Sequence, residues 1–148
     1  MKPLVIFFFI SLNTFSFGQL RTIEDARIFS VTFKDAVISH NEDEIIKHID
    51  TYYKKQQLGK LLKGNKDQFI NELLSGFSND SEEYITIDYK TITGMTISSI
   101  ENEESNDNWD VNFQITTPEN TINISLFLIS KRKGKSMKTK LGFVGGFG

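Results

Sequence analysis

The segment Trp109–Leu128, WDVNFQITTPENTINISLFL, decides the fold class of this chain. Apolar and polar residues alternate on both sides of a turn at Pro118–Asn120. Alternation with a period of two is typical of half-buried strands joined by a turn. The segment therefore predicts an antiparallel hairpin with one apolar face. The residues expected to point inward are Trp109, Val111, Phe113, Ile115, Ile122, Ile124, Leu126 and Leu128.

Three more strands are predicted around this hairpin. Ile85–Tyr89 and Met137–Phe143 show the same alternation, and Ile92–Ile100 forms an apolar strand with a bend at Gly94. We therefore expect the part of the chain after residue 84 to form a mostly antiparallel sheet.

The preceding part of the chain has helical periodicity. Thr22–Ser39 carries apolar residues at steps of three and four, as an amphipathic helix does. Asn41 is the expected N-cap of a second helix that runs through residue 53, and Asn65 that of a third, which ends at Gly76. Helices followed by a run of antiparallel strands predict an α+β fold.

This order of elements resembles the nuclear transport factor 2-like superfamily over about residues 21 to 144. The resemblance rests on the helices and on the three successive strands Trp109–Ile115, Ile122–Leu128 and Met137–Phe143. It implies a cone-shaped fold, in which a strongly curved antiparallel sheet wraps around helices. It also implies a pocket between the concave face of the sheet and the helices.

The N-terminal segment has the layout of a secretory signal peptide. Lys2 supplies a positive charge, Leu4–Leu12 is an apolar run, and Ser16–Gly18 places small residues before a cleavage site at Gly18/Gln19. The apolar run is too short for a helix that spans a bilayer. We expect residues 1–18 to be removed and residues 19–148 to form one exported domain, periplasmic or secreted. The Phe-rich signal is similar to those of exported bacterial proteins.

Composition excludes several classes of function. The chain has 17 basic and 19 acidic residues, for a net charge of −2, which argues against a general nucleic-acid-binding protein. It has no cysteine, so thiol chemistry, disulfides and thiolate zinc sites are excluded. We expect no permanent membrane anchor.

We expect a noncatalytic domain that binds a small apolar molecule or a protein partner, without a cofactor. The inward register of the last three strands holds no acid–base set, although enzymes of the resembled superfamily place a carboxylate or imidazole in the cavity. Aromatic residues are the candidates for ligand binding. These are Tyr52, Tyr53, Tyr89, Trp109 and Phe113.

Two alternatives stay open. An isomerase, dehydratase or cyclase-like enzyme would use His48 or Asp88 as base and a tyrosine as oxyanion donor. A dimeric accessory subunit would associate through its sheet, as many members of the resembled superfamily do.

Charged loops give no firm site. The two histidines do not make a zinc site, and the acidic stretch 101–108 lacks the pattern of a calcium loop. The basic turn 131–135 would contact an anion or protect a strand edge.

Overall fold

The computed structural model describes residues 22–61, 63–102, 108–132 and 139–145. The expected signal segment 1–18, most of the acidic stretch and most of the basic turn lie outside these ranges. No helix in the described ranges is long and apolar enough to cross a membrane.

The helices come first, as predicted. They are α1 (Ile23–Ile38), α2 (Glu42–Lys47), α3 (Thr51–Gln56), a π-helical turn η1 (Gln57–Leu61) and α4 (Lys66–Leu73). The strands that follow are β1 (Gly76–Ser78), β2 (Tyr84–Ile85), β3 (Gly94–Asn102), β4 (Trp109–Thr116), β5 (Thr121–Arg132) and β6 (Thr139–Gly145), with a short 3-10 helix η2 (Tyr89–Thr91) between β2 and β3. The predicted α+β class is confirmed.

Side-chain caps fix the helix starts where the sequence places them. Thr22 Oγ1 accepts the Asp25 N–H, and the Asp25 carboxylate accepts the Thr22 N–H, which completes a capping box. Asn41 caps α2 and Asn65 caps α4 by accepting a backbone N–H three residues on. These caps satisfy donors that a helix start leaves unpaired.

The prediction of one helix from Asn41 through residue 53 is wrong, because the helix is interrupted near its midpoint. Phe143 N–H donates to the His48 carbonyl at 2.8 Å, and Asp50 N–H donates to the Phe143 carbonyl at 2.8 Å. Asp50 then caps α3 by accepting the N–H groups of Tyr52 and Tyr53. The strand β6 thus takes over backbone groups that a continuous helix would have paired internally.

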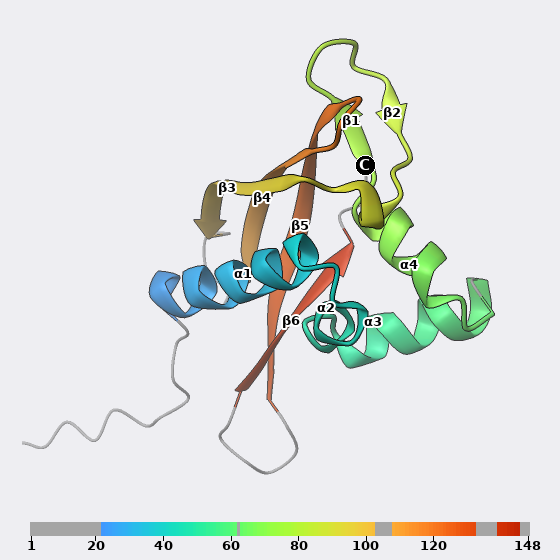
Figure 1. The fold of residues 1–148 in the computed structure, drawn as a ribbon. Helices are drawn as coiled ribbons and strands as arrows, with labels where there is room; N and C mark the ends of the chain where they lie inside the picture. The colour runs from blue at the N-terminus through green and yellow to red at the C-terminus, as the bar shows by residue number, and fades with distance from the viewer. Residues whose placement is uncertain (1–21, 62, 103–107, 133–138, 146–148) are drawn as a thin grey trace, which may run out of the picture.

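One curved sheet holds all six strands in the order β2-β1-β5-β4-β3, with β6 also paired to β5 (Figure 1). All pairs are antiparallel. β1 pairs with the start of β5 at Phe77↔Asn123, and β6 pairs with the rest of β5 from Leu126↔Gly145 onward. β1 and β6 therefore lie end to end along one edge of β5.

The region between α4 and β3 departs from prediction. α4 ends at Leu73, and Gly76 begins β1 instead of ending a helix. The predicted strand at Ile85–Tyr89 is only two residues long, Tyr84–Ile85. After this short strand, side chains accept the backbone N–H groups that a neighbouring strand would otherwise pair. Ser75 Oγ accepts the Ile87 N–H, and Asn71 Oδ1 accepts the Tyr89 N–H.

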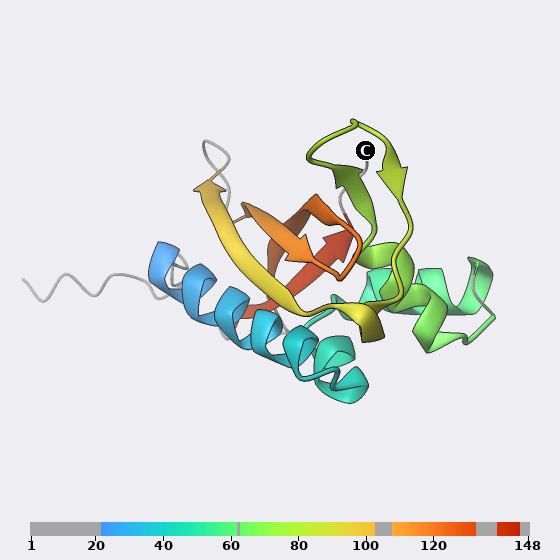
Figure 2. The same cartoon turned by 45° about the horizontal axis from the view of Figure 1, so that its top comes forward.

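The core lies between α1 and the apolar register of β4, β5 and β6. Helix α1 crosses the sheet beside β3 (Figure 2). Its Phe33 ring lies 4.7 Å from the ring of Phe143 and 5.8 Å from that of Phe113, measured between centroids, and all three are fully buried. The inward residues expected in β4 and β5 are all buried. The face next to α1 is thus filled by side chains.

Candidate functional site

A pocket of about 890 Å³ lies where β1, β2, α3 and α4 meet the middle of β5. We call it the sheet pocket. Its lining combines aromatic, amide and hydroxyl side chains with one carboxylate. The lining residues are Tyr53, Gln57, Phe69, Glu72, Leu73, Ser75, Gly76, Phe77, Tyr84, Thr86, Asn112, Asn123, Ile124, Ser125, Phe127 and Gly145.

Part of the lining of the sheet pocket belongs to the polar register of β4 and β5. Asn112 pairs with Ser125, and Phe127 follows two residues later in β5. These residues alternate with Val111, Phe113 and Leu126, which are buried in the core. Because successive side chains of a strand point to opposite faces, these three residues lie on the side away from the core, whereas Ile124 and Gly145 belong to the core register and extend the lining around the edge of β5.

Glycines allow close packing at the gap between β1 and β6. A Cβ atom at Gly145 would collide with the hydroxyl of Tyr53, and one at Gly76 would collide with the carbonyl of Asn123. Gly145 therefore lets the Tyr53 ring lie over the end of β6. Gly76 lets β1 approach β5 closely. Ser125 lies on β5 between the residues that these two strands contact.

Two exposed aromatic side chains form the rim of the pocket. Phe77 of β1 and Tyr84 of β2 are cross-strand partners whose rings meet edge to face, 5.5 Å apart. Their exposed fractions are 50% and 58%, unusually high for such large apolar rings. The sequence predicted a helix that ends at Gly76 and no strand at Phe77 or Tyr84, so this rim was missed.

The charge of the pocket comes from Glu72. Among the described residues it is the one lining side chain with a formal charge, and its carboxylate accepts a hydrogen bond from Gln68 Nε2 at 3.1 Å. Burial raises the pKa of the Tyr53 hydroxyl, a backbone hydrogen bond from Gly145 opposes this rise, and the charge of Glu72 adds to it. Tyr53 therefore stays neutral at physiological pH.

The five predicted ligand-binding residues do not come together. Tyr53 lines the sheet pocket, whereas Tyr52 is 69% exposed beside Lys131 Nζ, 5.5 Å from the centre of its ring. Trp109 and Phe113 are buried on the core face.

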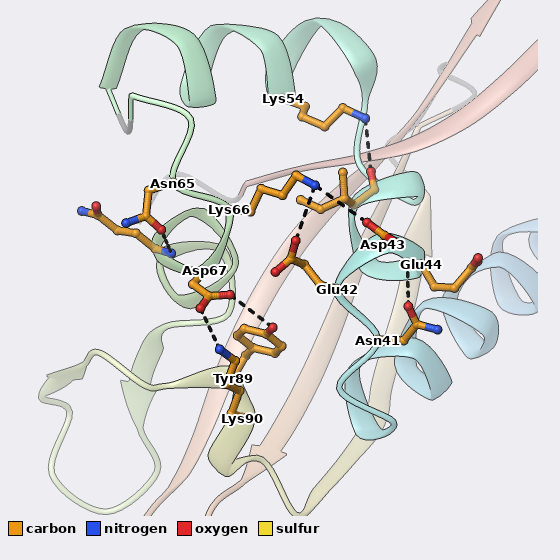
Figure 3. Close-up of polar contacts among 12 residues, drawn as sticks. Asn41, Glu42, Asp43, Glu44, Lys54, Asn65, Lys66, Asp67, Tyr89 and Lys90 are labelled. Atoms are coloured by element: carbon orange, nitrogen blue, oxygen red, sulfur yellow. Dashed lines mark hydrogen bonds and ion pairs between the residues drawn. The ribbon is translucent and has the colours of Figure 1, made fainter.

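Tyr89 is buried as well, and its hydroxyl donates to Asp67 at 3.3 Å (Figure 3). Lys90 Nζ donates to the same carboxylate at 2.7 Å. Next to this contact, Lys66 lies 3.5 Å from Glu42 and 3.8 Å from Asp43. These charged side chains are largely solvated, and their contacts join α2, α4 and η2.

The two residues of the enzyme alternative make separate hydrogen bonds. His48 uses Nδ1 with the Glu44 carbonyl at 2.7 Å and Nε2 with Thr32 Oγ1 at 3.0 Å. Asp88 is exposed and accepts the N–H of Lys90 at 3.0 Å. Neither residue lines the sheet pocket.

Within the described ranges, no group of three or more His, Asp or Glu side chains is placed to hold a metal ion. Comparison of the chain with models of protein families, with characterised proteins and with solved structures finds no significant match.

Proposed function

We propose that this chain is an exported, noncatalytic domain that binds a small molecule with an apolar body in the sheet pocket. The observation that carries the proposal is the lining of that pocket. Its volume of about 890 Å³ falls in the range of small-molecule sites, and aromatic rings line it together with amide, hydroxyl and carboxylate groups.

Concavity favours a small ligand over a flat protein contact. Phe69 and Leu73 come from α4, Phe77 and Tyr84 from the β1–β2 hairpin, and Phe127 from β5. Apolar groups thus converge from three directions on one space. Such a space can hold a small molecule against apolar side chains and remove part of its surface from water.

The chemistry of the lining supports binding more than catalysis. The titratable lining groups are Glu72, Tyr53 and Tyr84. The pKa of Tyr53 is raised, which moves its hydroxyl away from proton transfer near neutral pH. His48 and Asp88 make their hydrogen bonds elsewhere, so the noncatalytic alternative is the one we propose.

We also propose a relationship to the nuclear transport factor 2-like superfamily. Helices precede a curved antiparallel sheet, as that resemblance implies. However, the residues that face α1 fill the space there. The sheet pocket lies instead where α3 and α4 meet β1, β2 and β5.

Native mass spectrometry of the chain, purified gently after export, tests the proposal. We expect added mass that leaves on denaturation. Its occupancy should fall in Tyr84→Ala and Phe127→Ala, while Ile28→Ala, which removes an exposed apolar side chain on α1, should retain it. Equal occupancy in all variants would contradict the proposal. So would a chain without added mass whose pocket amide shifts do not change in NMR spectra when a fragment library is added.

A further inference from the structure

We propose that the ligand of the sheet pocket is an organic cation, in which an ammonium group is attached to an apolar body. This inference rests on the proposed function and names the class of molecule that the same site selects. Three features of the lining support it: its charge, two amide oxygens that can accept a hydrogen bond, and its aromatic rings.

The charge of the lining is negative. Glu72 contributes a carboxylate, and no Lys, Arg or His is among the lining residues of the described chain. Lys131 pairs with Asp50 and Lys90 pairs with Asp67, so these cations are held elsewhere. A phosphate or carboxylate ligand would meet repulsion from Glu72 without a compensating cation. A positively charged ligand would be attracted.

Two side-chain amides of the lining already use an N–H group as a donor. Asn112 donates through Nδ2 to Ser99 Oγ at 2.8 Å, and Asn123 donates through Nδ2 to Asn79 Oδ1. Among the hydrogen bonds of the described residues, none uses the Oδ1 atom of either amide. Acceptors of this kind favour a ligand that carries a hydrogen-bond donor beside its cationic group, as the hydroxyl of an amino alcohol does.

The aromatic rings complete the match. Tyr53, Phe69, Phe77, Tyr84 and Phe127 all line the pocket. The face of an aromatic ring attracts a cation within about 6 Å of its centre. Phe77 and Tyr84 are half-exposed at the rim, and the planes of their rings are inclined by 80° to each other. The same rings would cover the apolar body of the ligand.

Three soluble probes of nearly equal shape isolate the effect of charge. Choline is the cation, 3,3-dimethylbutan-1-ol is its uncharged counterpart, and 3,3-dimethylbutanoate is an anion. Each is titrated into the purified chain, and the amide shifts of Asn112, Ser125 and Phe127 are followed by NMR. We expect choline to bind roughly tenfold more tightly than the alcohol, and the anion to bind least.

Variants assign the preference to the pocket. Glu72→Gln should weaken choline binding roughly threefold and leave binding of the alcohol unchanged. Glu83→Gln is the matched control, because Glu83 is an exposed glutamate of the same region outside the lining. Tyr84→Leu should reduce the preference for choline while it preserves apolar contact.

The outcomes separate this inference from the proposed function. Equal binding of all three probes, or tightest binding of the anion, would overturn the cation while leaving a ligand pocket. A choline preference that both Glu72→Gln and Tyr84→Leu retain would overturn its assignment to these groups. No pocket shift with any probe would also contradict the cation, and native mass spectrometry would still test the pocket itself.

Discussion

Lys131 Nζ donates to the carboxylate of Asp50 at 2.9 Å, and this contact joins the end of β5 to the start of α3. The Asp50 side chain is only 10% exposed, whereas that of Lys131 is 51% exposed. The same carboxylate accepts two backbone N–H groups as the cap of α3. One buried acid therefore satisfies both a helix start and a long-range ion pair.

Replacement of Asp50 should destabilise the fold. Asp50→Ala removes a helix cap and the partner of Lys131, so we expect a loss of about 1–3 kcal/mol in the free energy of unfolding. Urea unfolding followed by circular dichroism measures it. Asp35→Ala is the control, since Asp35 is exposed near the C-terminal end of α1. A loss no larger than that of the control would contradict the dual role of Asp50.

The contribution of Asp50 should depend on pH. Burial alone would raise the pKa of its carboxyl, but hydrogen bonds from the Tyr53 N–H, Lys131 and the Tyr52 N–H outweigh burial and hold this pKa below its ordinary value of 3.8. A lowered pKa in the folded state stabilises the protein above the unfolded-state value, and this stabilisation is lost as the pH falls through the folded-state pKa. The difference in unfolding free energy between the wild type and Asp50→Asn should therefore be constant near pH 6 and shrink below pH 3.8. A difference that stays constant down to acid unfolding would refute this assignment.

Gly142 should not tolerate a side chain. A Cβ atom there would lie 2.8 Å from Asp50 Cα and 3.0 Å from Asp50 N, and backbone atoms cannot swing aside as the end of a long side chain can. We expect Gly142→Ala to cost about 1–3 kcal/mol by overpacking. Gly94→Ala is the matched control in the same sheet, because its nearest neighbour would be at 3.7 Å. Thermal unfolding of the two variants should rank them clearly, and equal melting temperatures would show that β6 can shift away.

A glycine at Glu82 should stabilise the β1–β2 turn. Glu82 adopts a left-handed conformation with φ of 55°, which costs a residue with a Cβ atom roughly 1 kcal/mol. Glu82→Gly removes that strain, although the greater freedom of glycine in the unfolded chain offsets part of the gain. We expect a small rise in melting temperature, while Glu83→Gly should lower it. The opposite ranking would show that the turn is not strained at Glu82.

Local signals predicted much of this fold. The starts of α1, α2 and α4 depend on side chains within three residues, and Thr22, Asn41 and Asn65 mark them plainly. The strands β4 and β5 follow the alternation of apolar residues because one face of each is buried. These features need only neighbouring residues, so a single sequence reveals them.

The candidate site depends on contacts that are distant in the sequence. The break between α2 and α3 arises from backbone hydrogen bonds to Phe143. Asn112, Ser125 and Phe127 line the pocket. Their register in the strands predicts exposure to solvent, because the sequence does not show that α4 and the β1–β2 hairpin lie beside them. Of the five predicted ligand-binding residues, only Tyr53 lines the pocket. It was predicted because it is an aromatic residue on the face of a helix.

The attachment of β1 to the rest of the sheet has a consequence for motion. Two residue pairs join β1 to β5, Phe77↔Asn123 and Ser78↔Ile122, and two more join it to β2. Segments held by so few ladder bonds open more often than the long β4–β5 ladder. Amide hydrogen exchange should therefore be faster in β1 and β2 than in β4. The rim residues Phe77 and Tyr84 would then move with β1 and β2 as these strands open and close. A bound molecule would slow amide exchange in these two strands more than anywhere else in the sheet.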